Sequence, residues 1–254
     1  MKKKIVIGNW KMNPLTEREA EKLFKSILKA IPYKLKAEVV ICPPFIYLEK
    51  LKKLSRKINL GAQDAFWGEV GAFTGEISPE MLANLGVKYL ILGHSERRAL
   101  GETDSMINKK LKAAIASGLK PILCVGEEVR DEKHEYFNIV KNQIIECLRG
   151  IPKNLLPKII IAYEPVWAIS STPNRRDATP ADSKEMAIFI RKVLSDLSSP
   201  SLAAATRVLY GGSVNDRDAG EFLSEGGADG VLPGKASLDA KKFSEIIRIA
   251  ENGS

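Results

Sequence analysis

Eight short runs of apolar and β-branched residues recur along this chain, and stretches with helical patterning separate them. Near-continuous apolar runs are typical of parallel strands buried on both faces, and their alternation with helices predicts βα units. Eight such units in 254 residues match a single closed (β/α)₈ barrel, which typically needs about 250 residues. We therefore predict one α/β domain over residues 1–254. The runs are residues 5–7, 37–42, 58–62, 89–92, 121–125, 159–162, 207–210 and 230–232.

Signals for helix ends support this interpretation. Thr16-Glu17-Arg18-Glu19 has the pattern of a capping box, and Ser78-Pro79 and Thr179-Pro180 each place a capping residue before a proline at the first helical position. Gly118 predicts the end of a helix over residues 108–117. An open doubly wound sheet is the alternative, but that fold usually carries a Gly-rich phosphate turn after its first strand. The segment Gly8-Asn9-Trp10-Lys11 does not match such a turn.

The charge balance restricts the classes of partner. The chain has 39 Lys and Arg against 31 Asp and Glu, a formal net charge of +8. A solvated basic surface accounts for this most simply, followed by a field that attracts an anionic substrate. Nucleic acid comes last, because the basic residues are spread along the chain and no nucleic-acid motif is recognisable. No nucleic-acid partner is therefore expected.

The N-terminus and the cysteines indicate a cytoplasmic protein. Lys2, Lys3 and Lys4 precede an apolar run that ends at once at Gly8-Asn9, whereas a secretory signal needs roughly 7–15 apolar residues. No apolar stretch approaches the roughly 20 residues of a membrane span, so no membrane partner is expected. The three cysteines, Cys42, Cys124 and Cys147, have neither C-x-x-C nor metal-site spacing, which fits reduced thiols.

Polar residues follow five of the predicted strands. In such barrels the active site lies at the C-terminal ends of the strands, so these residues should converge on one mouth. No metal cluster or cofactor fingerprint accompanies them, and no cofactor is expected. They are Asn9 and Lys11, then His94, Ser95 and Glu96, then Glu164, then Gly211, Gly212 and Ser213, and finally Gly234 and Lys235.

This set suits proton transfer next to a carbonyl in an anionic substrate. The Glu164 carboxylate can take a proton from carbon, and His94 can polarise a carbonyl and move protons between oxygens. Lys11 supplies positive charge near a developing oxyanion. The backbone N–H groups of Ser213, Gly234 and Lys235 can hold a phosphate.

Each residue alone has a simpler explanation. Lys11 can be a surface charge, Glu164 a turn residue before proline, and His94 a satisfied structural histidine. Gly211-Gly212 can be a tight turn. Their joint position at the strand ends favours the functional interpretation. By contrast, His134 lies in a polar stretch and is expected at the surface, and Cys124 is expected in the core.

At these positions the sequence resembles the triosephosphate isomerase family, and the resemblance extends from one end of the chain to the other. Members of that family have the (β/α)₈, or TIM-barrel, fold. In order along the chain the matching motifs are Gly8-Asn9-Trp10-Lys11-Met12-Asn13, Gly61-Ala62-Gln63-Asp64, Gly71-Ala72-Phe73-Thr74-Gly75-Glu76-Ile77-Ser78, Gly93-His94-Ser95-Glu96-Arg97-Arg98, Cys124-Val125-Gly126-Glu127, Ala162-Tyr163-Glu164-Pro165-Val166-Trp167-Ala168-Ile169 and Tyr210-Gly211-Gly212-Ser213-Val214-Asn215.

The resemblance implies interconversion of dihydroxyacetone phosphate and D-glyceraldehyde 3-phosphate through an enediolate. It makes Glu164 the base and His94 a neutral electrophile, a pairing well known in that family. Asn9 and Lys11 match substrate contacts, and Glu96 matches a polar supporting residue. Pro165, Val166, Trp167, Ala168 and Ile169 match the start of a lid over the phosphate, which excludes water and disfavours loss of phosphate.

The resemblance also implies an oligomer. The family's third loop, here residues 71–78, typically inserts into a neighbouring subunit and reaches the region of Asn9 and Lys11. Thr74 would lie at its tip. A homodimer is therefore the smallest assembly expected, and a tetramer stays open.

Two loops depart from the family pattern. The usual glycine-containing lid tip is replaced by a longer stretch without glycine, residues 170–177. Ser170 keeps a backbone N–H for the phosphate, and we expect activity to be retained with altered lid closure. In the eighth loop Lys235 adds a cation, which we expect to face solvent and not the phosphate.

Two other functions compete with this prediction. One is isomerisation of a different sugar phosphate, and the other is a binding or scaffold role for the basic surface. The presence of Asn9, Lys11, His94 and Glu164 together, with the resemblance along the whole chain, argues against a different sugar phosphate. It also argues against a scaffold, because a scaffold needs none of these residues.

Overall fold

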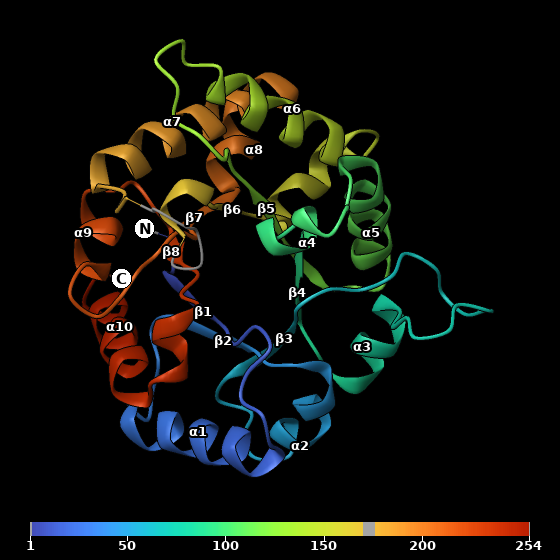
Figure 1. Cartoon of the computed structure of the whole chain (residues 1–254), viewed down its shortest axis with the longest axis vertical. Helices are drawn as coiled ribbons and strands as arrows, with labels where there is room; N and C mark the ends of the chain where they lie inside the picture. The colour runs from blue at the N-terminus through green and yellow to red at the C-terminus, as the bar shows by residue number, and fades with distance from the viewer. Residues whose placement is uncertain (1, 170–175, 254) are drawn as a thin grey trace.

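Eight parallel strands form a closed barrel in sequence order, and helices surround it (Figure 1). The computed structural model describes residues 2–169 and 176–253. The strands are β1 (Ile5–Asn9), β2 (Glu38–Cys42), β3 (Asn59–Ala62), β4 (Tyr89–Leu92), β5 (Lys120–Val125), β6 (Ile160–Tyr163), β7 (Arg207–Tyr210) and β8 (Gly230–Val231). All eight predicted strands are confirmed, with ends that shift by one or two residues.

Most of the α-helices form a ring outside the barrel, while the short α4 lies inside that ring (Figure 1). The α-helices are α1 (Glu17–Ala30), α2 (Leu48–Lys52), α3 (Pro79–Leu85), α4 (Ser95–Ala99), α5 (Asp104–Ala116), α6 (Tyr136–Leu148), α7 (Pro180–Leu197), α8 (Pro200–Ala205), α9 (Ala219–Ser224) and α10 (Ala240–Asn252). Short 3₁₀ helices occupy several connections: η1 (Phe45–Tyr47), η2 (Lys153–Lys158), η3 (Val166–Ala168) and η4 (Lys235–Leu238).

The predicted helix caps are confirmed. The Thr16 hydroxyl accepts a hydrogen bond from the Glu19 backbone N–H, and the Glu19 carboxylate accepts one from Thr16 N at 3.1 Å. Ser78 and Thr179 cap α3 and α7, each ahead of a proline in the first turn. Helix α5 begins at Asp104, four residues before the predicted start, because Thr103 caps it there.

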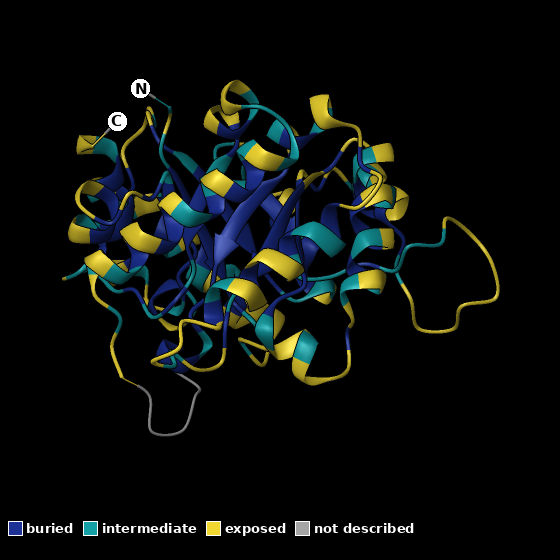
Figure 2. Cartoon of the chain, turned by 90° about the horizontal axis from the view of Figure 1, so that it is seen from above, coloured by how far each residue is buried: buried dark blue, intermediate teal, exposed yellow. Residues whose placement is uncertain are grey.

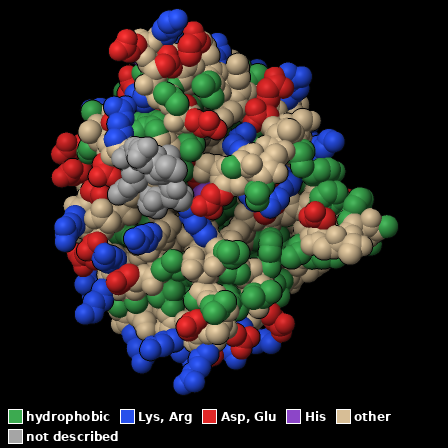
Figure 3. Space-filling model, viewed as in Figure 1, with side chains coloured by type: hydrophobic (Ala, Val, Ile, Leu, Met, Phe, Trp, Pro, Cys, Tyr) green, Lys and Arg blue, Asp and Glu red, His purple; other side chains and the backbone are tan. Residues whose placement is uncertain are grey.

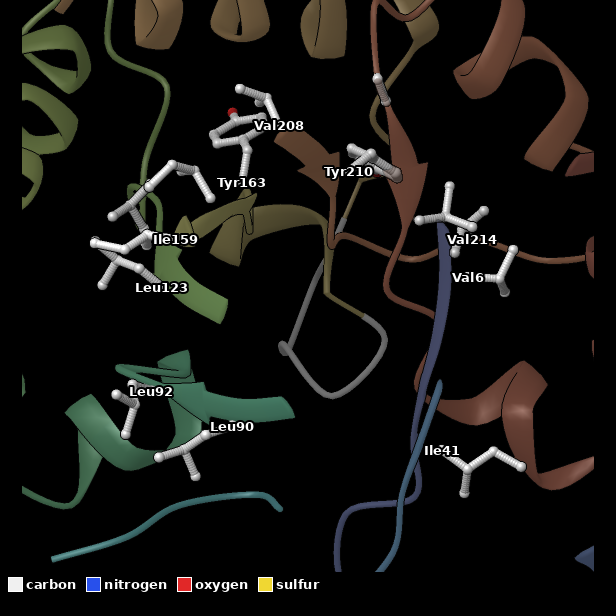
Figure 4. Packing of buried hydrophobic residues seen from close by; sticks show 14 of the residues in the cluster. Val6, Ile41, Leu90, Leu92, Leu123, Ile159, Tyr163, Val208, Tyr210 and Val214 are labelled. Atoms are coloured by element: carbon white, nitrogen blue, oxygen red, sulfur yellow. The ribbon is translucent and has the colours of Figure 1, made fainter. Parts of the chain in front are cut away.

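Alternation along the strands divides the buried side chains between two layers. Ile5 and Ile7 belong to a small cluster inside the barrel, while Val6 belongs to the larger cluster between barrel and helices. Figure 4 shows side chains of that larger cluster, among them Val6, Leu90 and Val208, around the strands. Cys124 lies in the inner cluster and is fully buried, as predicted. His134 is exposed, also as predicted.

The barrel is closed by the pairing of β1 with β8, in which Ile5 lies opposite Gly230. The two backbones approach so closely here that a Cβ atom on Gly230 would lie 2.1 Å from the carbonyl oxygen of Ile5. Glycine is therefore required where the last strand meets the first.

Two features outside the barrel bear on function. The connection between β3 and α3 projects far from the body of the molecule, and its tip is exposed (Figure 2). Both chain ends lie at one end of the barrel (Figure 2). Within the described residues, no helix has the length and apolar character that crossing a membrane requires.

We expect Gly230→Ala to lower the free energy of unfolding by about 3 kcal/mol, the upper range for overpacked sites. Gly220→Ala in α9 is the control, because its nearest neighbour would be Ile249 Cγ2 at 3.6 Å, an ordinary contact. Alanine there should leave stability unchanged or slightly raised. Chemical denaturation monitored by circular dichroism compares the two, and equal stability would show that closure tolerates a side chain at Gly230.

Candidate active site

The first strand delivers Asn9 and Lys11 to the mouth of the barrel. Asn9 is buried at the end of β1, and its Oδ1 accepts a hydrogen bond from Lys11 N at 3.0 Å. Lys11 has a φ of +52°, a conformation uncommon for residues with a side chain. Gln63 Nε2 donates to Lys11 O and to Cys42 O, both at 2.8 Å. Bonds on both sides of the Lys11 backbone therefore hold this conformation.

His94 forms the N-cap of α4, and this fixes its tautomer. Its Nδ1 accepts a hydrogen bond from the backbone N–H of Glu96 at 3.2 Å. A ring nitrogen that accepts carries no proton, so the network assigns a neutral imidazole with its proton on Nε2. His94 is mostly buried, at 7% exposure, and Nε2 lies 3.3 Å from Glu164 Oε1.

Glu164 follows β6 and is almost fully buried, at 1% exposure. Its Oε2 accepts a hydrogen bond from the Ser95 backbone N–H at 3.0 Å. Its Oε1, although close to His94, makes no hydrogen bond with the described residues. Burial, and then the charge of Glu164, raise the pKa of the Cys124 thiol well above its usual value, so that thiol stays neutral below the site. One carboxylate oxygen is thus left to accept a proton.

A lysine connects this pair to the opposite side of the mouth. Lys11 Nζ lies 2.6 Å from Glu96 Oε1, and the Glu96 side chain is 46% exposed. The Lys11 side chain also passes Gly234, where an added Cβ would lie 3.3 Å from Lys11 Cε. Lys11 therefore lies between His94 and the loop after β8.

Two glycine-containing turns form the other wall of the pocket. The turn after β7 contains Gly212, where an added Cβ would lie 2.4 Å from the Tyr210 hydroxyl, so only glycine fits. The turn after β8 leads into η4, whose first residues present backbone N–H groups. The Lys235 side chain is exposed. The pocket is lined by residues from both turns and from β1 and β4, among them Asn9, Lys11, His94, Ser213, Gly234 and Lys235.

A buried carboxylate holds the segment that follows Glu164. Glu127 Oε1 accepts hydrogen bonds from the Tyr163 hydroxyl at 2.7 Å and from Trp167 Nε1 at 2.8 Å. Arg130 Nε lies 3.2 Å from the same oxygen. On the other side, the Arg176 guanidinium lies 4.4 Å from the centre of the Trp167 ring. The expected lid residues 165–169 are thus anchored through Trp167.

The predicted site residues fall into three groups. The structure brings Asn9, Lys11, His94, Glu96, Glu164, Ser213, Gly234 and Lys235 to the barrel mouth. Thr74 lies on the exposed connection before α3. Ser170 and the altered lid tip over residues 170–175 lie outside the described residues.

Three positioning contacts were not predicted from the sequence: Ser95 N–H to Glu164, Gln63 to the backbone of Lys11, and Glu127 to Trp167. Gln63 and Glu127 stand within motifs noted above, but nothing in the sequence gives their partners. The Ser95 contact uses a backbone group and leaves no side-chain signal at all.

The arrangement is suited to moving protons on a small anion. A buried carboxylate with a free oxygen faces a neutral imidazole. A cation lines the same pocket as the imidazole, and two glycine-containing turns complete it. Among the described residues, no cluster of three or more His, Cys, Asp or Glu side chains could hold a metal ion.

We expect Glu127→Gln to destabilise the protein by about 3 kcal/mol, because it removes the fully buried charge that Arg130, Tyr163 and Trp167 share. Glu185→Gln is the matched control, since Glu185 pairs with the same arginine at 2.5 Å but its side chain is 45% exposed. An exposed pair contributes under about 1 kcal/mol. Denaturant unfolding followed by tryptophan fluorescence measures both, and equal losses would contradict a special role for the buried carboxylate.

Comparison with known proteins agrees with this geometry. Residues 4–250 match the family model described as triosephosphate isomerase. The triosephosphate isomerase of Thermoanaerobacter pseudethanolicus is 43% identical over 251 residues, which cover 97% of this chain and 99% of that protein. That of Dictyoglomus turgidum is 44% identical over 254 residues, covering 98% and 100%. The chain therefore belongs to the triosephosphate isomerase family.

Proposed function

We propose that the protein interconverts dihydroxyacetone phosphate and D-glyceraldehyde 3-phosphate by proton transfer through an enediolate. The observation that carries this proposal is the buried Glu164 carboxylate beside the neutral His94 imidazole, at 3.3 Å. Family membership supports the same reaction.

The chemical steps follow from the donors and acceptors at the mouth. Glu164 removes a proton from the carbon next to the carbonyl and later returns it to the neighbouring carbon. His94 presents its Nε2–H to the carbonyl oxygen and stabilises the negative charge that develops there. A neutral imidazole suits this role, because it can donate a proton and take one back from the adjacent oxygen. Lys11 adds a fixed positive charge, and Asn9 supports its backbone.

The phosphate would bind at the two turns. Ser213, Gly234 and Lys235 line the pocket, and backbone N–H groups at the start of a helical turn favour an anion. Ser170 would add a further N–H from the lid. With the phosphate at this wall, the carbon atoms of a three-carbon substrate extend towards Glu164 and His94.

The start of the lid is held before any substrate binds. Trp167 donates to Glu127 and is covered by Arg176, so the first part of the lid is fixed to the barrel. We propose that the substituted tip alters closure but not the chemical step.

We expect Glu164→Gln to lower kcat by about 10²–10⁴-fold, the usual contribution of a general base, with a smaller change in KM. Initial rates with D-glyceraldehyde 3-phosphate, coupled to reduction of the product, measure this. Glu128→Gln is the matched control, since Glu128 is exposed and lies beside the mouth. Equal rates for the two variants would contradict the role of Glu164.

We also propose that two copies associate through the projecting connection before α3. Its base is closed by a hydrogen bond from Phe66 N to Ile77 O at 2.9 Å, and Phe66 packs on Phe73 with ring centroids 4.6 Å apart. The base of the loop is therefore preorganised, while its tip projects away from the barrel (Figure 2). Its exposed apolar residue Val70 is 84% exposed.

The receiving surface lies near Lys11. Met12, Leu15, Ile46 and Leu100 are between 76% and 93% exposed there, and apolar side chains gather between the mouth and the projecting loop in Figure 3. An apolar surface of this kind next to a catalytic lysine is typical of an interface. The loop of one copy would cover this surface on the other and fix Lys11.

We expect Thr74→Arg to convert a dimer into a monomer and to lower kcat/KM by about 100-fold, the effect of a small displacement of catalytic groups. Ala204→Arg adds the same charge on exposed α8 and should leave assembly and rate unchanged. Sedimentation velocity gives the mass of each variant. A monomeric wild type, or a Thr74→Arg variant that stays dimeric, would contradict the proposed interface.

A cytoplasmic location fits this function. Cys42, Cys124 and Cys147 are all buried free thiols, as is usual for proteins of a reducing compartment. We propose that the enzyme acts there on free triose phosphates.

A further inference from the structure

Fourteen of the 39 Lys and Arg, accompanied by few carboxylates, lie in segments at the end of the barrel opposite the active site. We define the basic pole as the segments that lead from the chain start or from a helix end into each strand: residues 2–4, 31–38, 53–59, 86–89, 117–120, 149–160, 198–207 and 225–230. They contain 14 Lys and Arg but only three carboxylates, Glu38, Glu225 and Asp229, a net charge of +11. Since the whole chain carries +8, all other residues together sum to −3.

Two of the three carboxylates are already paired with cations within the fold. Glu38 accepts hydrogen bonds from Tyr89 and from Arg207, the latter at 2.8 Å, and its pKa is lowered although burial opposes this. Asp229 accepts from Arg191 at 2.8 Å, and its pKa is lowered in the same way. Glu251 at the end of α10 accepts the backbone N–H groups of Lys36 and Ala37. These carboxylates remain charged but have little capacity left for other cations.

Most of the cations, by contrast, have no acidic partner. Lys4 is turned inward and donates to the carbonyls of Leu223 and Ala228. Eight others have no carboxylate within ion-pair distance in the described part of the chain: Lys3, Lys34, Lys36, Arg56, Lys57, Lys88, Lys153 and Lys158. Lysines in the last turn of a helix complement its dipole, but residues such as Lys3 and Lys88 directly precede strands and have no such role.

A groove runs through part of this pole. Its volume is about 730 Å³, and it lies between the connections that lead into β3 and β4. Four cations line it, Lys52, Lys53, Arg56 and Lys88, together with the neutral side chains of Ser55, Asn59 and Asn84. The one carboxylate in its wall, Glu49, is paired with Lys53 at 2.6 Å.

An exposed aromatic ring stands beside these charges. Tyr33 is 91% exposed, and Lys57 Nζ lies 6.0 Å from the centre of its ring. Lys34 and Lys36 follow in the same connection. An exposed ring among unpaired cations is the combination that binds single-stranded nucleic acid, through stacking on bases and contacts to phosphates.

We propose that the basic pole binds single-stranded RNA without sequence preference and leaves the active site free. The expectation that there is no nucleic-acid partner rested on the spread of Lys and Arg along the sequence and on the lack of a recognisable motif. The fold brings 14 of those residues to one surface, and binding without sequence preference needs no base-reading motif. A membrane fits less well, because Tyr33 is the one large exposed apolar or aromatic residue in the described part of this pole, and peripheral membrane binding needs several buried apolar anchors.

The test uses fluorescence anisotropy with a labelled 20-nucleotide oligouridylate and the full-length protein. With about five phosphate contacts, the affinity should fall roughly 100-fold between 50 and 200 mM salt. The variant Lys34→Gln/Arg56→Gln/Lys88→Gln should bind at least 10-fold more weakly at 50 mM salt, with a shallower salt dependence. Its matched control, Lys133→Gln/Arg217→Gln/Lys241→Gln, removes the same charge from segments at the opposite end and should bind as the wild type does.

A further variant separates stacking from charge. Tyr33→Ala should weaken binding about 5-fold or more, in keeping with the loss of one stacked base, while the slope of the salt dependence stays unchanged. Isomerase rates measured in saturating RNA should equal those without it, so this inference stands or falls independently of the proposed reaction.

Four outcomes would overturn the inference. The first is that no RNA binding is detected at 50 mM salt with 50 µM protein. The second is that the pole variant and its control lose RNA affinity equally, which would show that binding depends only on the net charge of the protein. The third is that low-millimolar inorganic phosphate displaces more RNA than chloride does at the same ionic strength, which would show that the pole is a site for small anions. The fourth is binding to phosphatidylglycerol vesicles in preference to RNA.

Discussion

The pairing of β8 with β1 is the contact on which the rest of the structure depends. It closes eight parallel strands into a ring, with Ile5 opposite Gly230. Because all strands run in the same direction, closure sends every strand end with its following polar residues to one mouth, and every preceding connection to the opposite pole. An open sheet of the same strands would spread both sets along an edge. The site and the basic pole are thus two consequences of one hydrogen-bonded seam, at a position where only glycine allows the backbones to meet.

Around the mouth, backbone groups fix the orientation of the reacting side chains. The Glu96 N–H determines which nitrogen of His94 carries a proton, and the Ser95 N–H holds one oxygen of Glu164. The unusual φ of Lys11 is supported by Asn9 and Gln63. Such contacts keep a buried carboxylate, an imidazole and an ammonium group in a defined arrangement before substrate binds, which is the preorganisation that proton-transfer catalysis requires.

The two ends of the barrel differ in charge and in exposed apolar surface. The mouth carries the pocket, the projecting loop and a group of exposed apolar residues, whereas the opposite pole carries a net charge of +11. The proposed dimer draws on the projecting loop and the apolar residues near Lys11, whereas the proposed RNA surface draws on the opposite pole, so the two proposals use different residues. Because the cations of the basic pole lie far from the mouth, they do not compete with the pocket for a small anionic substrate.

Local patterns in the sequence were sufficient to predict the elements of the fold and to propose the reacting residues. Apolar runs and capping residues such as Thr16 and Ser78 act locally, so their patterns predict strands and helix starts to within a few residues. Glu164, His94 and Lys11 were found because their side chains follow predicted strands and match a family motif. Contacts between distant segments became visible only in the folded chain: Ser95 N–H with Glu164, Glu127 with Trp167, and the approach of cations from separate connections. Each of these contacts depends on where barrel closure places a segment. Contacts between segments that are distant in the sequence produce no local pattern from which they could be predicted.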